Sequence, residues 1–382
     1  MAKSHVHSLS GAKILLFLQI YVEKLTHLLH MSKKYSTFAA AKAENMASVA
    51  DIRRPIETEW KRYEKVLHES LQADEKVQQK VLDYISSRSG KQLRPLVVLL
   101  SAKMCNPITD KTLRTAVALE MLHNASLVHD DVVDSSDTRR GAPAVHTQWS
   151  NKVAILTGDY MLAKVIGLVA EVRNTQILEI VSQLGRSLSS GELAQLHVGQ
   201  SMWIGEDTYY HIIEQKTARL FQACAEAGAE SAGCTQRQRT ALREYGRMLG
   251  LCFQIKDDIF DYSDLEEIGK PTMSDLRDGK VTLPLIIALQ RAPQPEAEEI
   301  KAKGEKLMAT GEGLEARGEK EETTRILEEI KSFVLRFKGD EYAVQRMLEY
   351  KKKATEALQV FHDSPEKTSL LQLLDYAINR VQ

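Results

Sequence analysis

Helix-breaking residues and strand patterns are both scarce in this chain of 382 residues. It contains only 9 prolines and 20 glycines, whereas alanine, leucine, glutamate, lysine and glutamine, which have high helix propensity, are abundant. Alternating runs of β-branched residues bounded by turn dipeptides, the usual signature of strands, are nearly absent. The sequence therefore predicts an all-α protein that is long enough to bury a large core.

An excess of charge of one sign is also lacking. The chain has 51 basic and 52 acidic residues, which gives a net charge of −1. Such a balance attracts neither nucleic acid nor an anionic membrane, and no basic stripe with interleaved aromatic residues is present. We therefore expect no nucleic-acid partner, and any polyanion has to bind at a local cluster of cations.

Cysteine is rare, and its spacing carries no metal or redox motif. The four cysteines are Cys105, Cys224, Cys234 and Cys252, and no two of them form a CxxC pair. They lie in stretches that read as helices or loop edges, so we expect buried, reduced thiols. This usage is typical of an intracellular protein and predicts a cytoplasmic location.

The N-terminal region has no clear targeting pattern. Its apolar run Ile14–Val22 is too short to cross a bilayer, which needs about 20 apolar residues. No small-residue cleavage site follows it directly, and the first fifty residues contain no arginine, so signal and transit peptides fit poorly. We expect residues 1–50 to be a dispensable extension, since Met31 or Met46 could start the protein; a packed extra helix is the alternative.

From about residue 56 the chain reads as one helix after another. Apolar residues recur at helical spacing in segments 56–67 and 77–85. Longer predicted helices cover residues 113–134, 153–172, 177–198, 209–232 and 237–262. Residues 296–323 are highly charged with four glycines, which indicates a mobile insertion or a solvated helical hairpin. We predict a single all-α domain over residues 51–382.

Two aspartate clusters stand out because they recur at the same spacing inside apolar, helix-patterned stretches. The first cluster is Asp130, Asp131 and Asp134, and the second is Asp257, Asp258 and Asp261. Each places carboxylates at i, i+1 and i+4, so each helix carries one acidic face. A single cluster of this kind is more often a solvated face, but the recurrence and the apolar flanks favour a site.

Two acidic faces opposite each other need a cation between them. A pair of carboxylates 6 Å apart repels by roughly 2–3 kcal/mol at an effective dielectric constant near 20. Oxygen ligands suit hard divalent cations, and Mg²⁺ in particular binds a few carboxylates together with substrate phosphates. The two clusters therefore predict a magnesium site.

The helix that carries the first cluster has one stripe that changes from apolar to acidic. At 100° per residue, the stripe contains Leu119, Leu122, His123, Ser126, Asp130, Asp134 and Asp137. This order predicts a deep cleft with an apolar floor and a metal-binding mouth. His123 lies about two turns from Asp130 on the same face, which favours a binding role over a purely structural one.

Basic residues alternate with the two clusters along the chain. They are Lys91, Arg94, Arg139, Arg140, Lys216, Lys270 and Lys280. Arginine offers a planar fork for phosphate oxygens, and lysine offers a point charge. Each one alone would be an ordinary surface cation. Together with the carboxylates they indicate a pocket for diphosphates that arrive with Mg²⁺.

Six segments of the chain resemble the trans-isoprenyl diphosphate synthases, which form the polyprenyl synthetase family. The matching segments are GKQLRP (90–95), LHNASLVHDDVVDSSDTRRG (122–141), GDYMLA (158–163), KTA (216–218), FQIKDDIFDY (253–262) and GKPTMSDLRDGKVTLPL (269–285). The resemblance covers roughly residues 56–290 and, more loosely, the rest of the chain. It implies a helical bundle around a central cavity, a homodimer, and at most peripheral contact with a membrane.

The resemblance also implies a role for each matching residue. The implied Mg²⁺ ligands, for three ions once diphosphate is bound, are Asp130, Asp134, Asp257, Asp258 and Asp261, with Asp131 in support. The implied contacts to the allylic diphosphate are Arg139, Lys216, Thr217, Gln254 and Lys270, and Lys216 counts with the aspartates as catalytic. The implied contacts to isopentenyl diphosphate are Gly90, Lys91, Arg94, His123 and Arg140. The expected reaction joins the two substrates head to tail through an allylic carbocation.

Product length is inferred from the residues just before the first aspartate cluster, because bulk at these positions limits elongation in this family. Here Ala125 and Ser126 are small, so a growing chain would pass them towards Leu122 and Leu119. We therefore expect a long-chain, all-trans product of the kind used for quinone side chains. One departure from the family pattern is Met273, which stands where the family usually has glycine.

Other functions fit the sequence less well. A class I terpene cyclase would not need the second diphosphate site at Lys91, Arg94 and His123, and its mixed second metal motif is absent. A non-catalytic subunit of a two-component synthase usually loses Asp or Arg positions that this chain keeps. A short-chain synthase remains open as the alternative product class. A purely structural bundle explains neither aspartate cluster.

Overall fold

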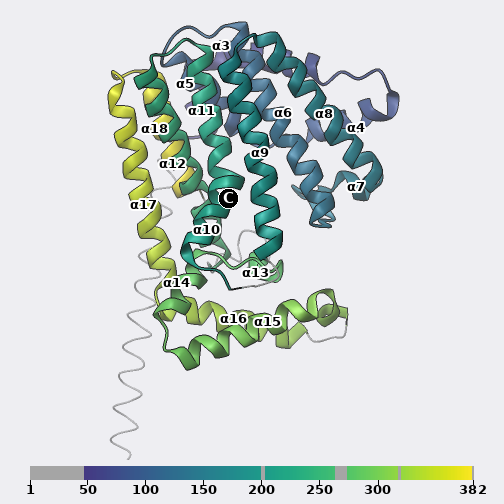
Figure 1. Cartoon of the computed structure of the whole chain (residues 1–382), viewed down its shortest axis with the longest axis vertical. Coiled ribbons are helices and arrows are strands. Elements are labelled where there is room, and N and C mark those ends of the chain that lie inside the picture. Colours follow the sequence, from purple (N-terminus) through teal and green to yellow (C-terminus); the bar gives the residue numbers. More distant parts are fainter. Residues whose placement is uncertain (1–46, 199–202, 263–272, 317–319, 381–382) are drawn as a thin grey trace, which may run out of the picture. The chain divides into compact units, whose positions relative to one another are not determined.

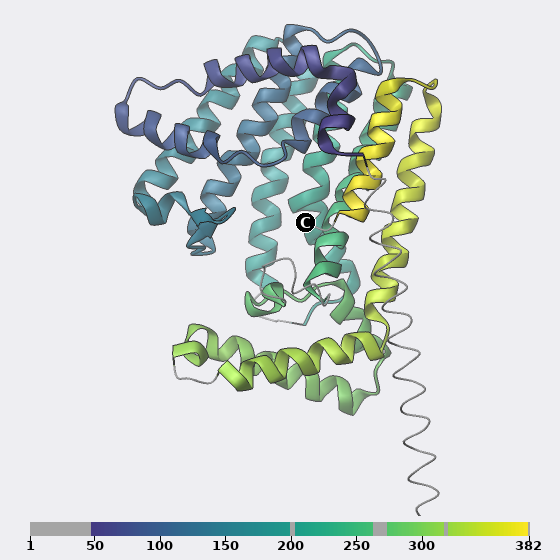
Figure 2. The same cartoon turned by 180° about the vertical axis from the view of Figure 1, so that it is seen from behind.

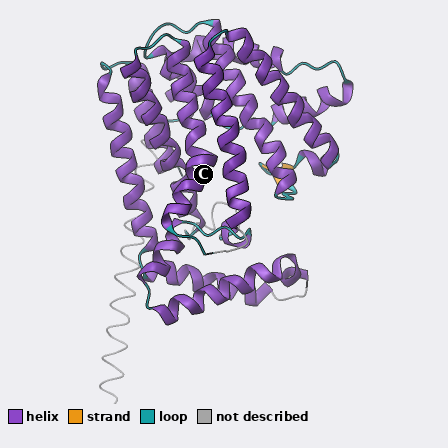
Figure 3. Cartoon of the chain, in the orientation of Figure 1, coloured by secondary structure: helices purple, strands orange, loops and turns teal. Residues whose placement is uncertain are grey.

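The structure is a computed structural model, and it describes residues 47–198, 203–262, 273–316 and 320–380. These residues are almost entirely helical, as Figure 3 shows, so the predicted all-α class is confirmed. The helices are α2 (Val49–Arg53), α3 (Glu57–Ser70), α4 (Lys76–Ser87), α5 (Leu93–Lys103), α6 (Asp110–Val133), α7 (Val145–Gln148), α8 (Asn151–Val172), α9 (Thr175–Val198), α10 (Glu206–Ile213), α11 (Arg219–Ser231), α12 (Gln236–Asp261), α13 (Ser274–Arg277), α14 (Leu283–Arg291), α15 (Gln294–Ala316), α16 (Lys320–Arg336), α17 (Gly339–Ala357) and α18 (Pro365–Asn379). Short 3₁₀ turns cover Arg54–Ile56 and Leu358–Val360, and a two-residue ladder pairs β1 (Thr138–Arg139) with β2 (Ala142–Pro143).

The long helices begin and end close to where the sequence pattern places them, with one exception. The segment 209–232 is not one helix: α10 and α11 are joined by a π-helical turn at Glu214–Ala218. Such turns are rare and are found mostly at functional sites. The hydrophobic pattern cannot reveal one extra residue in a single turn, which is why the interruption was not predicted.

The core of the unit Ala47–Ile378 is built from helices that run side by side in Figures 1 and 2. Helix α6 packs against α8, α11 packs against α5 and α12, and α12 packs against α17. The α5–α11 contact is close because Gly228 has no side chain: a Cβ there would lie 2.4 Å from the carbonyl oxygen of Val98. These contacts bring the ends of α6 and α12, which carry the aspartate clusters, into one region.

The described residues of the highly charged segment 296–323 lie within two helices, α15 and α16, which pack against each other (Figure 2). Ion pairs join them: the Nζ of Lys303 lies 2.7 Å from Glu329, and that of Lys306 lies 2.5 Å from Glu322. A helical hairpin, one of the two predicted alternatives, is therefore present. Most of the predicted extension, residues 1–46, lies outside the described residues.

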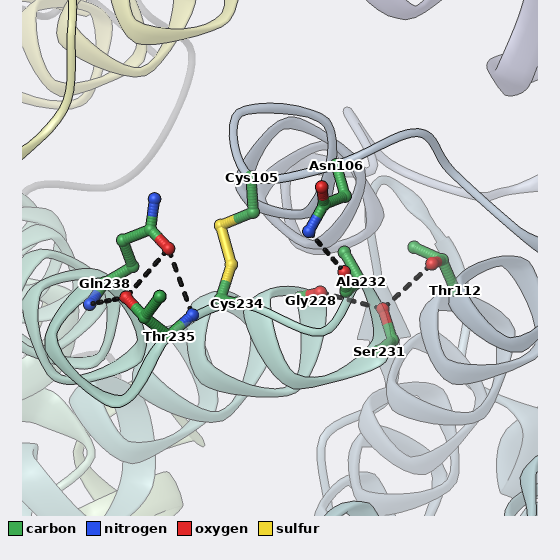
Figure 4. The surroundings of a disulfide bond; sticks show 9 residues. All are labelled: Cys105, Asn106, Thr112, Gly228, Ser231, Ala232, Cys234, Thr235 and Gln238. Carbon is green, nitrogen blue, oxygen red and sulfur yellow. Dashed lines mark hydrogen bonds between the residues drawn. A yellow bond between two sulfur atoms is a disulfide. The ribbon is translucent and has the colours of Figure 1, made fainter.

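The cysteine prediction is wrong for two of the four residues. Cys105, after α5, and Cys234, before α12, form a disulfide with a Cα–Cα distance of 5.6 Å (Figure 4). The two residues are 129 positions apart in the sequence, and only the packing of α5 against α11 brings their loops together. Cys224 and Cys252 are buried free thiols, as predicted. The bonded pair removes the argument from cysteine usage for a reducing compartment.

Helix α8 has an unusually apolar exposed face. Among the described helices, it alone is long and apolar enough to cross a bilayer by length and composition, with a mean hydropathy of 1.7, although core helices of soluble proteins also meet this criterion. Leu156 and Ile166 are 66% and 68% exposed, and Leu193 on the neighbouring α9 is 67% exposed. Large exposed apolar side chains thus occur on two neighbouring helices, and contiguous apolar patches on a protein surface mark contact sites.

Candidate active site

The first aspartate cluster lies at the C-terminal end of α6. Asp131 is 3% exposed and accepts a hydrogen bond of 2.9 Å from the Nε of Arg139, on β1. Burial raises the pKa of Asp130 to about 6, and the nearby charge of Glu192 adds to this effect. A helix C-terminus already carries partial negative charge, so carboxylates there reduce stability. A nearby cation offsets this cost, as the guanidinium of Arg139 does for Asp131.

The second aspartate cluster lies at the C-terminal end of α12 and is held by a hydrogen-bond chain. Thr217 donates to the Oε1 of Gln254 at 2.7 Å, and the Nε2 of Gln254 donates to Asp258 at 3.0 Å. The hydroxyl of Tyr209 donates to the other oxygen of Asp258. Burial and the nearby charge of Asp275 raise the pKa of Asp258 well above its usual range.

The segment after the second cluster folds back onto it. The backbone N–H groups of Met273 and Asp275 donate to the carbonyl and the carboxylate of Asp261, at 3.0 and 3.2 Å. Met273 has a φ of 61° and is 1% exposed. This left-handed conformation is the one that glycine adopts most readily, which is consistent with the glycine expected at this position from the resemblance. Here the backbone cost is offset by burial of the methionine side chain.

The second cluster faces a cavity, and Lys280, which lines this cavity, reaches towards the first cluster. The Nζ of Lys280 lies 4.0 Å from the Oδ2 of Asp134, while the backbone N–H of Lys280 donates to the carbonyl of Asp275 at 2.7 Å. The adjoining cavity has a volume of about 210 Å³. Its walls come from α10, the π-helical turn, α12 and residues 275–282, and its polar lining includes Gln195, Lys216, Thr217, Gln254, Asp258, Asp275 and Lys280.

Lys216 projects from the π-helical turn and is held by α9. Its Nζ lies 2.5 Å from the Oε2 of Glu192 and donates to the Oε1 of Gln195 at 3.0 Å. Lys216 is thus paired with Glu192 and Gln195 of α9. Neither of these residues was predicted from the sequence to belong to the site.

A separate basic group lies at the N-terminal end of α5. Gly90 is close to Arg140, since a Cβ on this glycine would lie 3.0 Å from the guanidinium carbon. Arg140 also donates to the carbonyl of Arg88 at 2.5 Å. Burial, with the positive charge of Arg94 and Arg140, holds the pKa of His123 well below its usual range, so its imidazole is neutral.

The members of this group differ in how firmly they are held. The Nε of Arg94 is buried without a hydrogen-bond partner among the described residues, and the guanidinium lies 5.3 Å from the centre of the Phe221 ring. The ammonium of Lys91 lies 5.2 Å from the centre of the Tyr376 ring. Arg94 is therefore a buried cation with donor capacity left for a ligand.

Some predicted site residues do not line this cavity, and one lies outside the described residues. Lys270 lies outside the described residues. Leu119, Leu122 and Ala125 are buried, and Ser126 donates to the carbonyl of His123 at 2.9 Å. None of these four residues lines the cavity next to Lys216, so their role in product length stays a prediction.

Sequence reasoning missed four residues at the site. Glu192, Gln195, Tyr209 and Asp275 all contact predicted site residues. Asp275 falls inside the matched segment 269–285, where its charge was a usable signal. The spacing of Glu192 and Gln195 at i and i+3 also places them on one helix face, but nothing in the sequence showed which element they face.

Comparison with known proteins agrees with this arrangement. The family model for polyprenyl synthetase matches residues 75–316. The octaprenyl diphosphate synthase of Haemophilus influenzae is 31% identical over 89% of this chain and 99% of its own. The geranylgeranyl diphosphate synthase of Methanosarcina mazei is 34% identical over 78% and 88%. A decaprenyl diphosphate synthase structure from Rhodobacter capsulatus superposes with a TM-score of 0.78 and 30% identity, covering 88% of this chain and 100% of that one. The chain therefore belongs to the polyprenyl synthetase family and is a trans-prenyltransferase.

Proposed function

We propose that this enzyme condenses isopentenyl diphosphate with an allylic diphosphate, head to tail, to give a long-chain all-trans polyprenyl diphosphate for quinone side chains. One observation carries the proposal: Asp258 of the second cluster lines a cavity from which Lys280 reaches Asp134 of the first cluster, and a second, separate basic group lies around Arg94, His123 and Arg140. A condensation of two diphosphates needs two such anion sites. A reaction of one diphosphate needs only the first.

The donor set fits Mg²⁺. Asp130, Asp134, Asp257, Asp258 and Asp261 offer only oxygen ligands. Burial raises the pKa of Asp130 and of Asp258, so a cation bound beside them would favour the ionised form. No three His, Cys, Asp or Glu side chains in the described parts of the chain gather tightly enough to hold one ion by themselves. This is compatible with Mg²⁺, which is usually bound by one or two carboxylates together with substrate phosphates. Bound Mg²⁺, three ions in our proposal, would supply the positive charge that stabilises a departing diphosphate.

The protein's own residues divide the remaining tasks. Lys216, Thr217 and Gln254 line the cavity and hold the allylic diphosphate, with Arg139 and Lys270 assigned to it as well. Its C–O bond breaks to leave diphosphate and an allylic cation. The alkene of isopentenyl diphosphate then forms the new C–C bond, and the departing diphosphate accepts the proton that is lost.

Isopentenyl diphosphate is held in the second site, where Gly90 and Lys91 precede α5, Arg94 lies in its first turn, and His123 and Arg140 lie close to them. Because His123 is neutral and buried, it donates one hydrogen bond without drawing water into the site. A dry pocket is required, since water would quench the cation.

Product length follows from the wall formed by α6. Because Ala125 and Ser126 are small, a growing chain would pass them towards Leu122 and Leu119. Relatives whose names state a product include octaprenyl and decaprenyl synthases. The geranylgeranyl diphosphate synthase of Methanosarcina mazei supports the short-chain alternative. Sizing the product separates the two.

We further propose a cytoplasmic homodimer in which the exposed apolar faces of α8 and α9 meet. Leu156, Ile166 and Leu193 are each about two-thirds exposed, and burying them against a second copy would be favourable at about 25 cal/mol per Å². Contact with a membrane is then at most peripheral, for product release. Sedimentation of L156D shows a monomer if this face joins the copies, and an unchanged dimer if it does not.

The function is tested by a product assay. Purified protein receives Mg²⁺, isopentenyl diphosphate and farnesyl diphosphate, and the dephosphorylated products are sized by mass spectrometry. A ladder of long polyprenols that disappears with EDTA supports the proposal. A single short product supports the short-chain alternative. No condensation contradicts the proposed activity and favours a non-catalytic subunit of a heteromeric synthase.

A further inference from the structure

The contact between α9 and the π-helical turn is unusually close at the position of Lys216. A Cβ on Gly191 would lie 2.8 Å from the Cβ of Gln215 and 3.0 Å from the Cγ of Lys216. The absent side chain of Gly191 therefore allows the stem of Lys216 to lie directly on α9. The next residue, Glu192, is then in reach of the ammonium group.

The ammonium group of Lys216 has three N–H donors, and α9 occupies two of them. Glu192 lies 2.5 Å away and Gln195 accepts at 3.0 Å. Both acceptors come from one rigid helix, so they fix the direction of the third donor. Lys216 and Gln195 both line the cavity beside the second aspartate cluster.

Burying the carboxylate of Glu192 at this position costs free energy, which argues against a passive role. Its side chain is 13% exposed, and its Oε1 is buried without a hydrogen-bond partner among the residues described. A buried carboxylate with one unsatisfied oxygen is unfavourable unless a cation stays beside it. Lys216 thus has to remain in contact with Glu192 while it binds anything else.

We propose that Glu192 is a positioning residue, which with Gln195 holds the ammonium group of Lys216 so that its third donor meets the diphosphate of the allylic substrate. The inference rests on the proposed function, because it assumes that Lys216 binds that diphosphate. Glu192 and Gln195, both on α9, then act on the substrate only through Lys216.

The test compares two neutral substitutions of similar length. E192Q and E192M both remove the negative charge, but only E192Q keeps an oxygen acceptor for Lys216. Calorimetric titration with inorganic diphosphate in the presence of Mg²⁺ gives the dissociation constant for each. We expect E192M to bind about tenfold more weakly than E192Q, the size of effect expected from one charge-assisted hydrogen bond. The same ordering is expected in KM for the allylic substrate, with a smaller change in kcat.

The same pair in a K216M background shows whether Glu192 acts through Lys216. In the K216M background we expect the dissociation constants of E192Q and E192M to differ less than about twofold, because the acceptor at position 192 has no ammonium group to position. Equal affinities with Lys216 present, or a difference that persists in K216M, overturn the inference. If wild-type protein binds no diphosphate with Mg²⁺, the proposed function fails together with it.

A matched control lies elsewhere in the molecule. The Lys103–Glu59 pair is similar in distance and exposure, at 2.8 Å with side chains 28% and 17% exposed. Substituting Glu59 with Gln and with Met reports the effect of disturbing a half-buried ion pair as such. If substitution of Glu59 changes the affinity for diphosphate as much as substitution of Glu192 does, a specific role of Glu192 is contradicted.

Discussion

Lys280 reaches from the segment after α12 to the first aspartate cluster, where its Nζ lies 4.0 Å from the Oδ2 of Asp134. The backbone of the same residue is anchored to Asp275. Lys280 thus joins the two halves of the site and supplies positive charge where the carboxylates lack it. We expect it to stand in partly for the metal in the metal-free enzyme.

This role predicts that K280M makes stability more dependent on Mg²⁺. Because the pair is about one-third exposed, the loss in metal-free protein should be only about 0.5–1 kcal/mol. Thermal unfolding with and without Mg²⁺ measures it: the stabilisation by the metal should be larger for K280M than for wild type. An equal stabilisation would show that Lys280 does not relieve the repulsion.

The buried carboxylate of Asp275 predicts a pH-dependent stability. Burial and the charge of Asp261 raise its pKa to about 7. Since the folded protein binds this proton more tightly than the unfolded chain, the stabilisation is present below about pH 4 and is lost as the pH rises through 7. In metal-free protein, D275N should therefore be more stable than wild type at pH 8, by about 1–3 kcal/mol, and nearly equal at pH 4. Urea unfolding at both pH values checks this.

The control for this prediction is D278N, since the side chain of Asp278 lies nearby but is 63% exposed. The substitution D278N should change the free energy of unfolding only slightly at both pH values. A difference between D275N and wild type that does not vary with pH would contradict the assignment to titration of Asp275.

The Cys105–Cys234 disulfide predicts two free thiols per denatured chain before reduction and four after it. A bond that closes a loop of 129 residues stabilises a protein by about 2–4 kcal/mol. Reducing agent should lower the melting temperature of wild type by several degrees and leave that of C105S unchanged. Four thiols in the untreated protein would show that the bond does not form.

The small residues on α6 predict a change in product length. A125F puts a large side chain where Ala125 is fully buried, next to Ser126 on the stripe that leads from Asp134 to Leu119. We expect shorter products than those of wild type, sized by mass spectrometry, with S126F shortening them as well. Products of unchanged length would place the elongation channel along another wall. Circular dichroism of both variants confirms that they are folded.

Much of this molecule was predictable from its sequence because the deciding signals are local. Helical periodicity placed α6 and α12 to within three residues at each end, and the two aspartate clusters indicated one site before any contact was known. What the sequence could not show depends on long-range packing. The disulfide needs α5 to pack against α11, and the Glu192–Lys216 pair needs α9 to pack against a turn that is π-helical. Both follow from how helices meet, which periodicity does not encode.

The account claims above all that the two aspartate clusters form one site for a magnesium diphosphate. Titration of inorganic diphosphate into wild-type protein, D130A and D257A, each with and without Mg²⁺, tests this most directly. We predict tight binding only for wild type with Mg²⁺, and a loss of at least about tenfold for either substitution, since each removes a charged ligand. Binding that survives in D130A or D257A, or that needs no Mg²⁺, would contradict the shared site.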